Sequence, residues 1–133
     1  ALVGRKVAIV SDKPQTTRRR ILGIRSAPEG QIVFVDTPGL HKPLHRLNKM
    51  MMEEALEAIR EVDLRLLVVD VSVPEGSGDR WSYELLARGP RPNAVLLNKI
   101  DRLPVKTALL PRMAGLAETG AFEEIVPVSA LTG

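Results

Sequence analysis

The sequence contains no cysteine and only two histidines among its 133 residues. Without cysteine it can form no disulfide, no cysteine nucleophile and no thiolate zinc site, and two histidines are too few for a histidine-rich metal centre. No apolar run approaches the ~18 residues that a membrane-spanning helix needs. With 44% hydrophobic and 26% charged residues, the composition is that of an ordinary globular protein of one domain.

Basic side chains are concentrated near the start of the chain. The net charge is +3, but residues 1–25 hold seven lysines and arginines and a single acidic residue, Asp12. That segment therefore carries +6 and the remainder −3. A basic segment of this kind can face phosphate groups or RNA. It also fits a solvated face, which is the interpretation that charge alone favours.

Short apolar runs predict five strands. Four of the runs are nearly continuous in apolar character, which is typical of strands covered on both faces in a parallel sheet. These four are residues 31–36, 64–70, 94–98 and 124–129. Residues 19–27 form the fifth candidate. We expect it at a sheet edge, because its pattern is mixed and charged.

A period near 3.6 predicts helices between the strands. In the first, over residues 47–62, one stripe is apolar and consists of Leu47, Met51, Ala55, Ile59 and Val62. Asp79 is expected to cap a second helix over residues 80–88. A third helix is predicted over residues 107–118, where Pro111 indicates a preceding turn or a kink.

The order of elements is strand, strand, helix, strand, helix, strand, helix, strand. This alternation predicts an α/β fold with right-handed crossovers, in which functional side chains lie at the carboxyl ends of the strands. Asp36, Asn98 and Ser129 end three of the predicted strands and are placed for such work. Asp70 ends a fourth, where we expect it to cap the following loop.

The first motif is Asp36-Thr37-Pro38-Gly39, directly after a predicted strand. An aspartate at a strand end can hold Mg²⁺ through water, and a glycine three residues later lets its N–H approach a phosphate oxygen. Taken alone, these residues indicate no more than a turn.

The second motif is Asn98-Lys99-Ile100-Asp101. Guanine presents two neighbouring N–H donors that one carboxylate can accept, so Asp101 is the expected selector of guanine. Asn98 can tie the loop together, and the alkyl stem of Lys99 can lie over the face of the base. The alternative is an exposed polar loop.

Two weaker signals accompany these motifs. Ser129-Ala130-Leu131 follows the last strand, where small residues let backbone N–H groups reach a base carbonyl. Thr16 and Thr17 lie in a polar loop, where a threonine can offer its hydroxyl to Mg²⁺ and its N–H to a γ-phosphate. Each is uninformative in isolation, but chance rarely places all four clusters in this order.

The stretches PQTTRRRILGI, QIVFVDTPGLHKP, LNKID and EIVPVSALTG resemble those of the Era family of bacterial ribosome-assembly GTPases, within the TRAFAC class of P-loop GTPases. The resemblance covers essentially all 133 residues. It implies a Ras-like P-loop GTPase domain, with a mostly parallel sheet and flanking helices. It also implies GTP or GDP and Mg²⁺ as ligands.

The resemblance assigns roles to individual residues. It implies that Thr17, with Thr16 as the alternative, is the switch I threonine, and that Thr17 and Asp36 hold Mg²⁺. Catalysis is then expected at Thr17, Asp36 and Gly39. The nucleotide would be bound by Thr16, Thr17, Asp36, Thr37, Pro38, Gly39, Asn98, Lys99, Asp101, Ser129, Ala130 and Leu131. Leu40 stands where many small GTPases carry a catalytic glutamine, so hydrolysis cannot depend on a glutamine there.

The resemblance also implies partners and a location. It predicts action on 16S rRNA in maturation of the 30S subunit, by a monomer in the cytoplasm, with peripheral association with the inner membrane as a further expectation. The basic residues 18–20 are candidates for contacts to the RNA.

The sequence departs from the family in one respect: it contains no GxxxxGK[ST] phosphate-binding loop. We therefore expect residues 1–133 to be a partial GTPase domain that starts after that loop, lacks the first strand and the family's KH domain, and is inactive alone. The alternatives are a nucleotide-free α/β binding module, and a related GTPase of tRNA modification or ribosome assembly.

Overall fold

The computed structural model describes Val3 and residues 20–37, 46–89 and 92–133. The chain forms two compact units, which are Ala1–Val62 and Asp63–Gly133. The order of helices and strands along the chain is the predicted one. No helix in the described ranges has both the length and the apolar character needed to span a bilayer.

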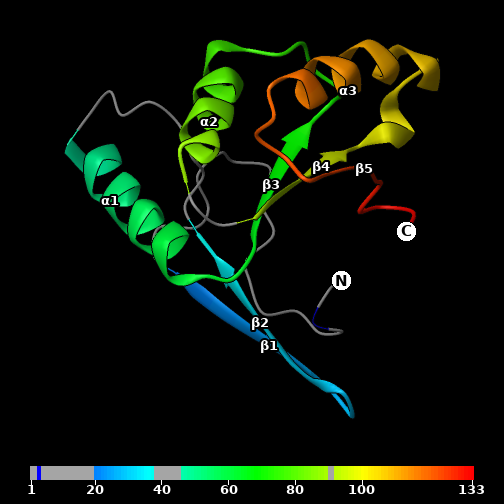
Figure 1. The fold of residues 1–133 in the computed structure, drawn as a ribbon. Coiled ribbons are helices and arrows are strands. Elements are labelled where there is room, and N and C mark those ends of the chain that lie inside the picture. Colours follow the sequence, from blue (N-terminus) through cyan, green and yellow to red (C-terminus); the bar gives the residue numbers. More distant parts are fainter. Residues whose placement is uncertain (1–2, 4–19, 38–45, 90–91) are drawn as a thin grey trace. The chain divides into compact units, whose positions relative to one another are not determined.

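The first unit contains an antiparallel hairpin of β1 (Ile21–Ala27) and β2 (Gly30–Asp36) (Figure 1). Gly30 follows the two-residue turn with a φ of +150°, which favours glycine. The prediction that residues 31–36 are covered on both faces is wrong here, since Ile32 and Val33 are 57% and 52% exposed. Within the described ranges β2 pairs with β1, and no described element of its own unit covers these two side chains.

Helix α1 (Arg46–Glu61) belongs to the same unit and confirms the helix predicted over residues 47–62. Ala55 is buried, as the predicted stripe requires, but Met52 and Ala58 are buried with it, while Ile59 and Val62 are only half-buried. Among the residues of α1 whose burial is described, the buried stripe is therefore rotated relative to the expected one.

Arg20 links the start of the hairpin to α1. Its guanidinium donates to Glu57 at 2.7 Å and to Glu61 at 2.6 Å. The two carboxylates lie one helical turn apart and are therefore neighbours on the same face of α1. Hydrogen bonding to Glu61 and then Glu57 raises the pKa of Arg20, so this arginine is engaged within its own unit.

The second unit contains a parallel sheet in the order β3 (Arg65–Asp70), β4 (Asn93–Asn98), β5 (Glu124–Pro127). The crossovers contain α2 (Ser77–Ala87) and α3 (Leu109–Glu118) (Figure 1). This confirms the predicted parallel α/β arrangement. β4 is buried along most of its length, as predicted. β3 and β5 are not, because Leu66 and Val68 on β3 and Val126 on β5 are exposed.

The helix ends of the second unit confirm one prediction and correct another. A short 3₁₀ turn, η2 (Lys106–Ala108), precedes α3, so that Pro111 lies in the first turn of the helix, where its missing N–H costs nothing. Asp79 is not the N-cap of α2. Gly76 occupies that position, and the Asp79 carboxylate accepts a hydrogen bond from the Gly76 N–H at 2.8 Å.

A buried polar side chain joins the sheet of the second unit to the segments that flank it. Asn93, at the start of β4, donates to the carbonyl oxygens of Leu86 at 3.1 Å and Ala121 at 2.8 Å. These bonds join the end of α2 and the segment before β5 to the central strand. Tyr83 and Phe122 pack edge to face beside them, with ring centroids 5.7 Å apart. The amino end of β4 is therefore joined to both of the elements that flank it in the second unit.

Candidate functional site

Asn98 is the last residue of β4 and ties two loops together. Its side-chain Oδ1 accepts a hydrogen bond from the N–H of Lys99 at 2.8 Å and another from the N–H of Ala130 at 2.9 Å. Ala130 lies just beyond β5, the strand adjacent to β4. The structure thus brings together the NKID and SAL segments, which are about thirty residues apart in the sequence.

The chain turns sharply after Asn98. Lys99 has a φ of +69°, and within the described ranges it is the only residue other than glycine with a positive φ. The short 3₁₀ turn η1 (Ile100–Arg102) follows immediately. A left-handed backbone at a lysine is strained and persists only where its surroundings hold it, which is common at functional sites. Here the Asn98 side chain supplies that restraint.

Asp101 is exposed and is oriented by Ser129. The Ser129 hydroxyl donates to Asp101 Oδ1 at 2.6 Å, and Ser129 Oγ accepts from the N–H of Thr132 at 3.2 Å. Ser129 itself is only 5% exposed. The buried hydroxyl therefore fixes an exposed carboxylate at the rim of the sheet, where it can accept hydrogen bonds from a ligand.

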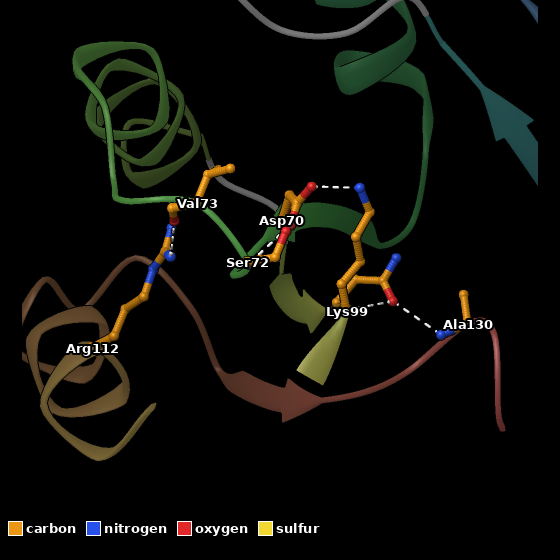
Figure 2. Close-up of polar contacts among 7 residues, drawn as sticks. Asp70, Ser72, Val73, Lys99, Arg112 and Ala130 are labelled. Atoms are coloured by element: carbon orange, nitrogen blue, oxygen red, sulfur yellow. Dashed lines mark hydrogen bonds and ion pairs between the residues drawn. The ribbon is translucent and has the colours of Figure 1, made fainter. Parts of the chain in front are cut away.

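Asp70 adds a contact that the sequence analysis did not predict. Its carboxylate accepts from the N–H of Ser72 at 2.9 Å, which confirms the expected loop cap, and also from the Lys99 ammonium at 2.5 Å (Figure 2). Burial alone would raise the pKa of Asp70, but hydrogen bonds from Lys99 and Ser72 outweigh it and lower the pKa to about 2. The sequence placed Asp70 at the end of a predicted strand, but it did not show that this strand is the neighbour of β4.

The other predicted site residues are distributed as follows. Asp36 is the last residue of β2, in the first unit, and Thr37 follows it. The meeting of Asp36 with the cluster at Asn98 and Asp101 stays a prediction. Leu131 is exposed. Four of the predicted residues lie outside the described ranges: Thr16, Thr17, Pro38 and Gly39. The residues that the structure describes include no cluster of three carboxylate or histidine side chains able to hold a metal ion.

Comparison with known proteins assigns the family. Residues 1–99 match the model of the 50S ribosome-binding GTPase family. The GTPase Era of Geobacter metallireducens is 48% identical over 132 residues, as is that of Clostridioides difficile. These matches cover 99% of this chain but 44% of either relative, so the chain spans less than half the length of these curated proteins.

Solved structures agree with the sequence comparison. A crystal structure of Era in complex with MgGDPNP and a segment of 16S ribosomal RNA superimposes with a TM-score of 0.89 at 35% identity, over 99% of this chain and 45% of that one. Aquifex aeolicus Era bound to GDP and AlF4⁻ gives 0.86 at 34% identity, over 98% and 45%. The chain therefore belongs to the 50S ribosome-binding GTPase family, and it corresponds in sequence and fold to the GTPase-domain portion of Era.

Proposed function

We propose that the intact gene product binds and hydrolyses GTP and acts as a switch in maturation of the small ribosomal subunit. The observation that carries this proposal is the set of cross-loop hydrogen bonds that fixes Asp101 beside Asn98 and Ser129. We propose further that residues 1–133 are part of one GTP-binding domain.

The chemistry at Asp101 favours guanine over the other bases. The N1–H and the exocyclic N2 amine of guanine are adjacent donors, and a carboxylate accepts from both, whereas adenine would place an acceptor against it. Ser129 donates to one oxygen of Asp101 from the protein side. We assign the selection of guanine to Asp101, support of the base to Ser129, Ala130 and Leu131, and contact with its face to Lys99.

The DTPG segment has the chemistry of a magnesium and γ-phosphate element. One carboxylate with a threonine hydroxyl suits Mg²⁺, which keeps several waters and takes its other ligands from substrate phosphates. Asp36 at the end of β2 supplies that carboxylate. We assign the hydroxyl to Thr17, with Thr16 as the alternative, and the γ-phosphate contact to Gly39, flanked by Thr37 and Pro38. When bound, the ion would neutralise charge on the phosphates.

Hydrolysis is proposed for the intact gene product. The 133 residues hold no GxxxxGK[ST] loop, whose backbone N–H groups and lysine supply most of the phosphate binding in such enzymes. We expect these residues alone to be inactive. Residues 1–133 alone should bind guanine nucleotides more weakly because contacts to the phosphates are missing, but they should still prefer guanine to other bases.

The role in ribosome maturation is supported by relatives. Era has been crystallised with 16S ribosomal RNA, and we extend that partner, and the 30S subunit, to this protein. Among the three consecutive arginines, Arg20 is engaged by Glu57 and Glu61. Arg18 and Arg19 are then the better candidates for contact with RNA. We propose a cytoplasmic monomer, with peripheral association with the inner membrane.

The experiment that tests the proposal is a nucleotide titration of the intact gene product and its Asp101→Asn variant. The carbonyl of the introduced amide can still accept from Ser129, so the loop should stay folded. The variant should lose affinity for GTP and gain affinity for xanthosine triphosphate, because xanthine carries a carbonyl where guanine has its amino group. Asp79→Asn, at the start of α2, is the matched control and should leave the preference unchanged. An unaltered preference in Asp101→Asn, or no guanine-nucleotide binding by the wild type, would contradict the proposal; the latter would favour a nucleotide-free module.

A further inference from the structure

The ion pair between Asp70 and Lys99 is built into the sheet. Asp70 and Asn98 are register partners at the carboxyl ends of β3 and β4, and the N–H of Val71 donates to the Asn98 carbonyl at 3.0 Å, which extends the ladder by one step. Lys99 is the next residue after Asn98, so its backbone is held next to the end of the paired strands. The ammonium then reaches Asp70 Oδ2 at 2.5 Å. Both ends of the lysine side chain are therefore tied to the second unit.

The Asp70 carboxylate is itself oriented. Its Oδ1 accepts from both the N–H and the hydroxyl of Ser72, at 2.9 and 2.6 Å, which turns Oδ2 toward Lys99 (Figure 2). The side chains of Asp70 and Lys99 are 35% and 41% exposed, so a ligand can still approach the lysine stem. The two bonds from Ser72 are enough for Asp70 to cap the loop. The ion pair with Lys99 is a further contact that capping does not require.

We propose that Asp70 is a positioning residue for nucleotide binding, which holds the Lys99 side chain extended so that its alkyl stem meets the face of the base selected by Asp101. This inference rests on the proposed function of the site. A free lysine has four rotatable bonds, and a ligand that uses its stem must immobilise them. Asp70 removes that cost before the ligand arrives, because the strained backbone of Lys99 and the ion pair together restrict the side chain.

A double-mutant cycle tests this inference on the intact gene product, with GDP affinity as the readout. Asp70→Asn keeps an acceptor for Ser72 but loses the charge that holds the ammonium. Lys99→Met keeps an apolar stem without the amine. We expect Asp70→Asn to weaken GDP binding roughly 3- to 10-fold in the wild-type background, as a partly exposed charge-assisted bond allows. In the Lys99→Met background the same substitution should change the affinity less than about 2-fold, since no ion pair remains.

Two matched controls separate positioning from loop folding. Ser72→Ala removes one of the two bonds that orient the same carboxylate but leaves the Ser72 N–H bond and the ion pair, so it should weaken GDP binding less than Asp70→Asn does. Asp79→Asn removes a charge from another helix-capping carboxylate and should change nothing. If Asp70→Asn weakens binding equally with lysine or methionine at position 99, or has no effect in either background, Asp70 acts only on the loop and the inference is overturned.

A second measurement needs no variant. In the nucleotide-bound wild-type protein, the ammonium protons of Lys99 should exchange with water more slowly than those of Lys106, which lies on an exposed 3₁₀ turn. Equal exchange would overturn the inference even if the variants fail to fold. Both measurements presuppose that the wild type binds GDP. Absence of that binding would end the proposed function and this inference together, whereas binding without coupling between Asp70 and Lys99 would end the inference alone.

Discussion

The hydroxyl of Ser129 donates a 2.6 Å hydrogen bond to Oδ1 of Asp101, 28 residues earlier in the chain. One partner is buried and the other is exposed. A rigid interior group therefore orients an acceptor that faces solvent, so that a ligand does not have to order it. The same two loops are joined a second time by the contact between Asn98 and Ala130. The cluster is thus organised by contacts within the chain itself.

Removal of the Ser129 hydroxyl should weaken guanine-nucleotide binding. Ser129→Ala leaves Asp101 without its internal donor, and we expect a loss of about 1–2 kcal/mol, or roughly 5- to 30-fold in Kd. Isothermal titration with GDP measures it. Ser82→Ala is the control, since it removes a buried hydroxyl that donates to the Gly78 carbonyl within α2. A Ser129→Ala protein that binds GDP as tightly as the Ser82→Ala protein would contradict the assigned role.

The ionisation of Asp70 should make the free energy of unfolding depend on pH. Burial of its carboxyl opposes ionisation, but hydrogen bonds from Lys99 and Ser72 prevail and hold its pKa at about 2, below the ordinary 3.8. Because the folded-state pKa is the lower one, the ionised carboxylate contributes stability above about pH 4 and loses it as the pH falls toward about 2. The free energy of unfolding in urea should therefore fall less steeply over this range in Asp70→Asn than in the wild type. Parallel curves for the two proteins would contradict the prediction.

Gly89 leaves room for the buried guanidinium of Arg65. A Cβ at position 89 would lie 1.8 Å from Arg65 Nη1. Gly89→Ala must therefore displace a packed side chain, and we expect it to lower the free energy of unfolding by about 1–3 kcal/mol.

The contrasting substitution is Gly115→Ala, in the middle of α3. A Cβ there meets nothing within 4 Å. Alanine is also the better helix former, so this variant should gain about 0.5–1 kcal/mol. Chemical unfolding of both variants measures the difference, and a Gly89→Ala protein as stable as Gly115→Ala would show that Arg65 yields without cost.

Local patterns were enough to predict the order of elements and the strand ends at which Asp36, Asn98 and Asp70 lie, because apolar runs and the polar residues that end them are local features. Exposure of β2, β3 and β5 was mispredicted, since a continuous apolar run does not reveal which neighbours cover each face of a strand. Ser129 was expected to end the last strand, but β5 ends two residues earlier, at Pro127. The N-cap of α2 was misplaced by three residues, because an aspartate favours both the N-cap and the N3 position.

Contacts between distant residues were the hardest to predict. The pairing of Lys99 with Asp70 depends on which two strands are neighbours and on their register. Neither can be inferred from the residues of one segment alone. The resemblance to a known family named Asn98, Asp101 and Ser129 as site residues. Only the fold showed that their side chains hydrogen-bond to one another and to the neighbouring backbone.

The central claim is that separate polar clusters of this chain serve one guanosine nucleotide. A crystal structure of the intact gene product with a non-hydrolysable GTP analogue and Mg²⁺ tests it most directly. We expect both carboxylate oxygens of Asp101 at the N1 and N2 donors of the base, with Asp36 beside the ion at the other end of the same nucleotide. A structure in which Asp36 and Asp101 lie on different sides of the molecule, or in which the base is bound elsewhere, would contradict it.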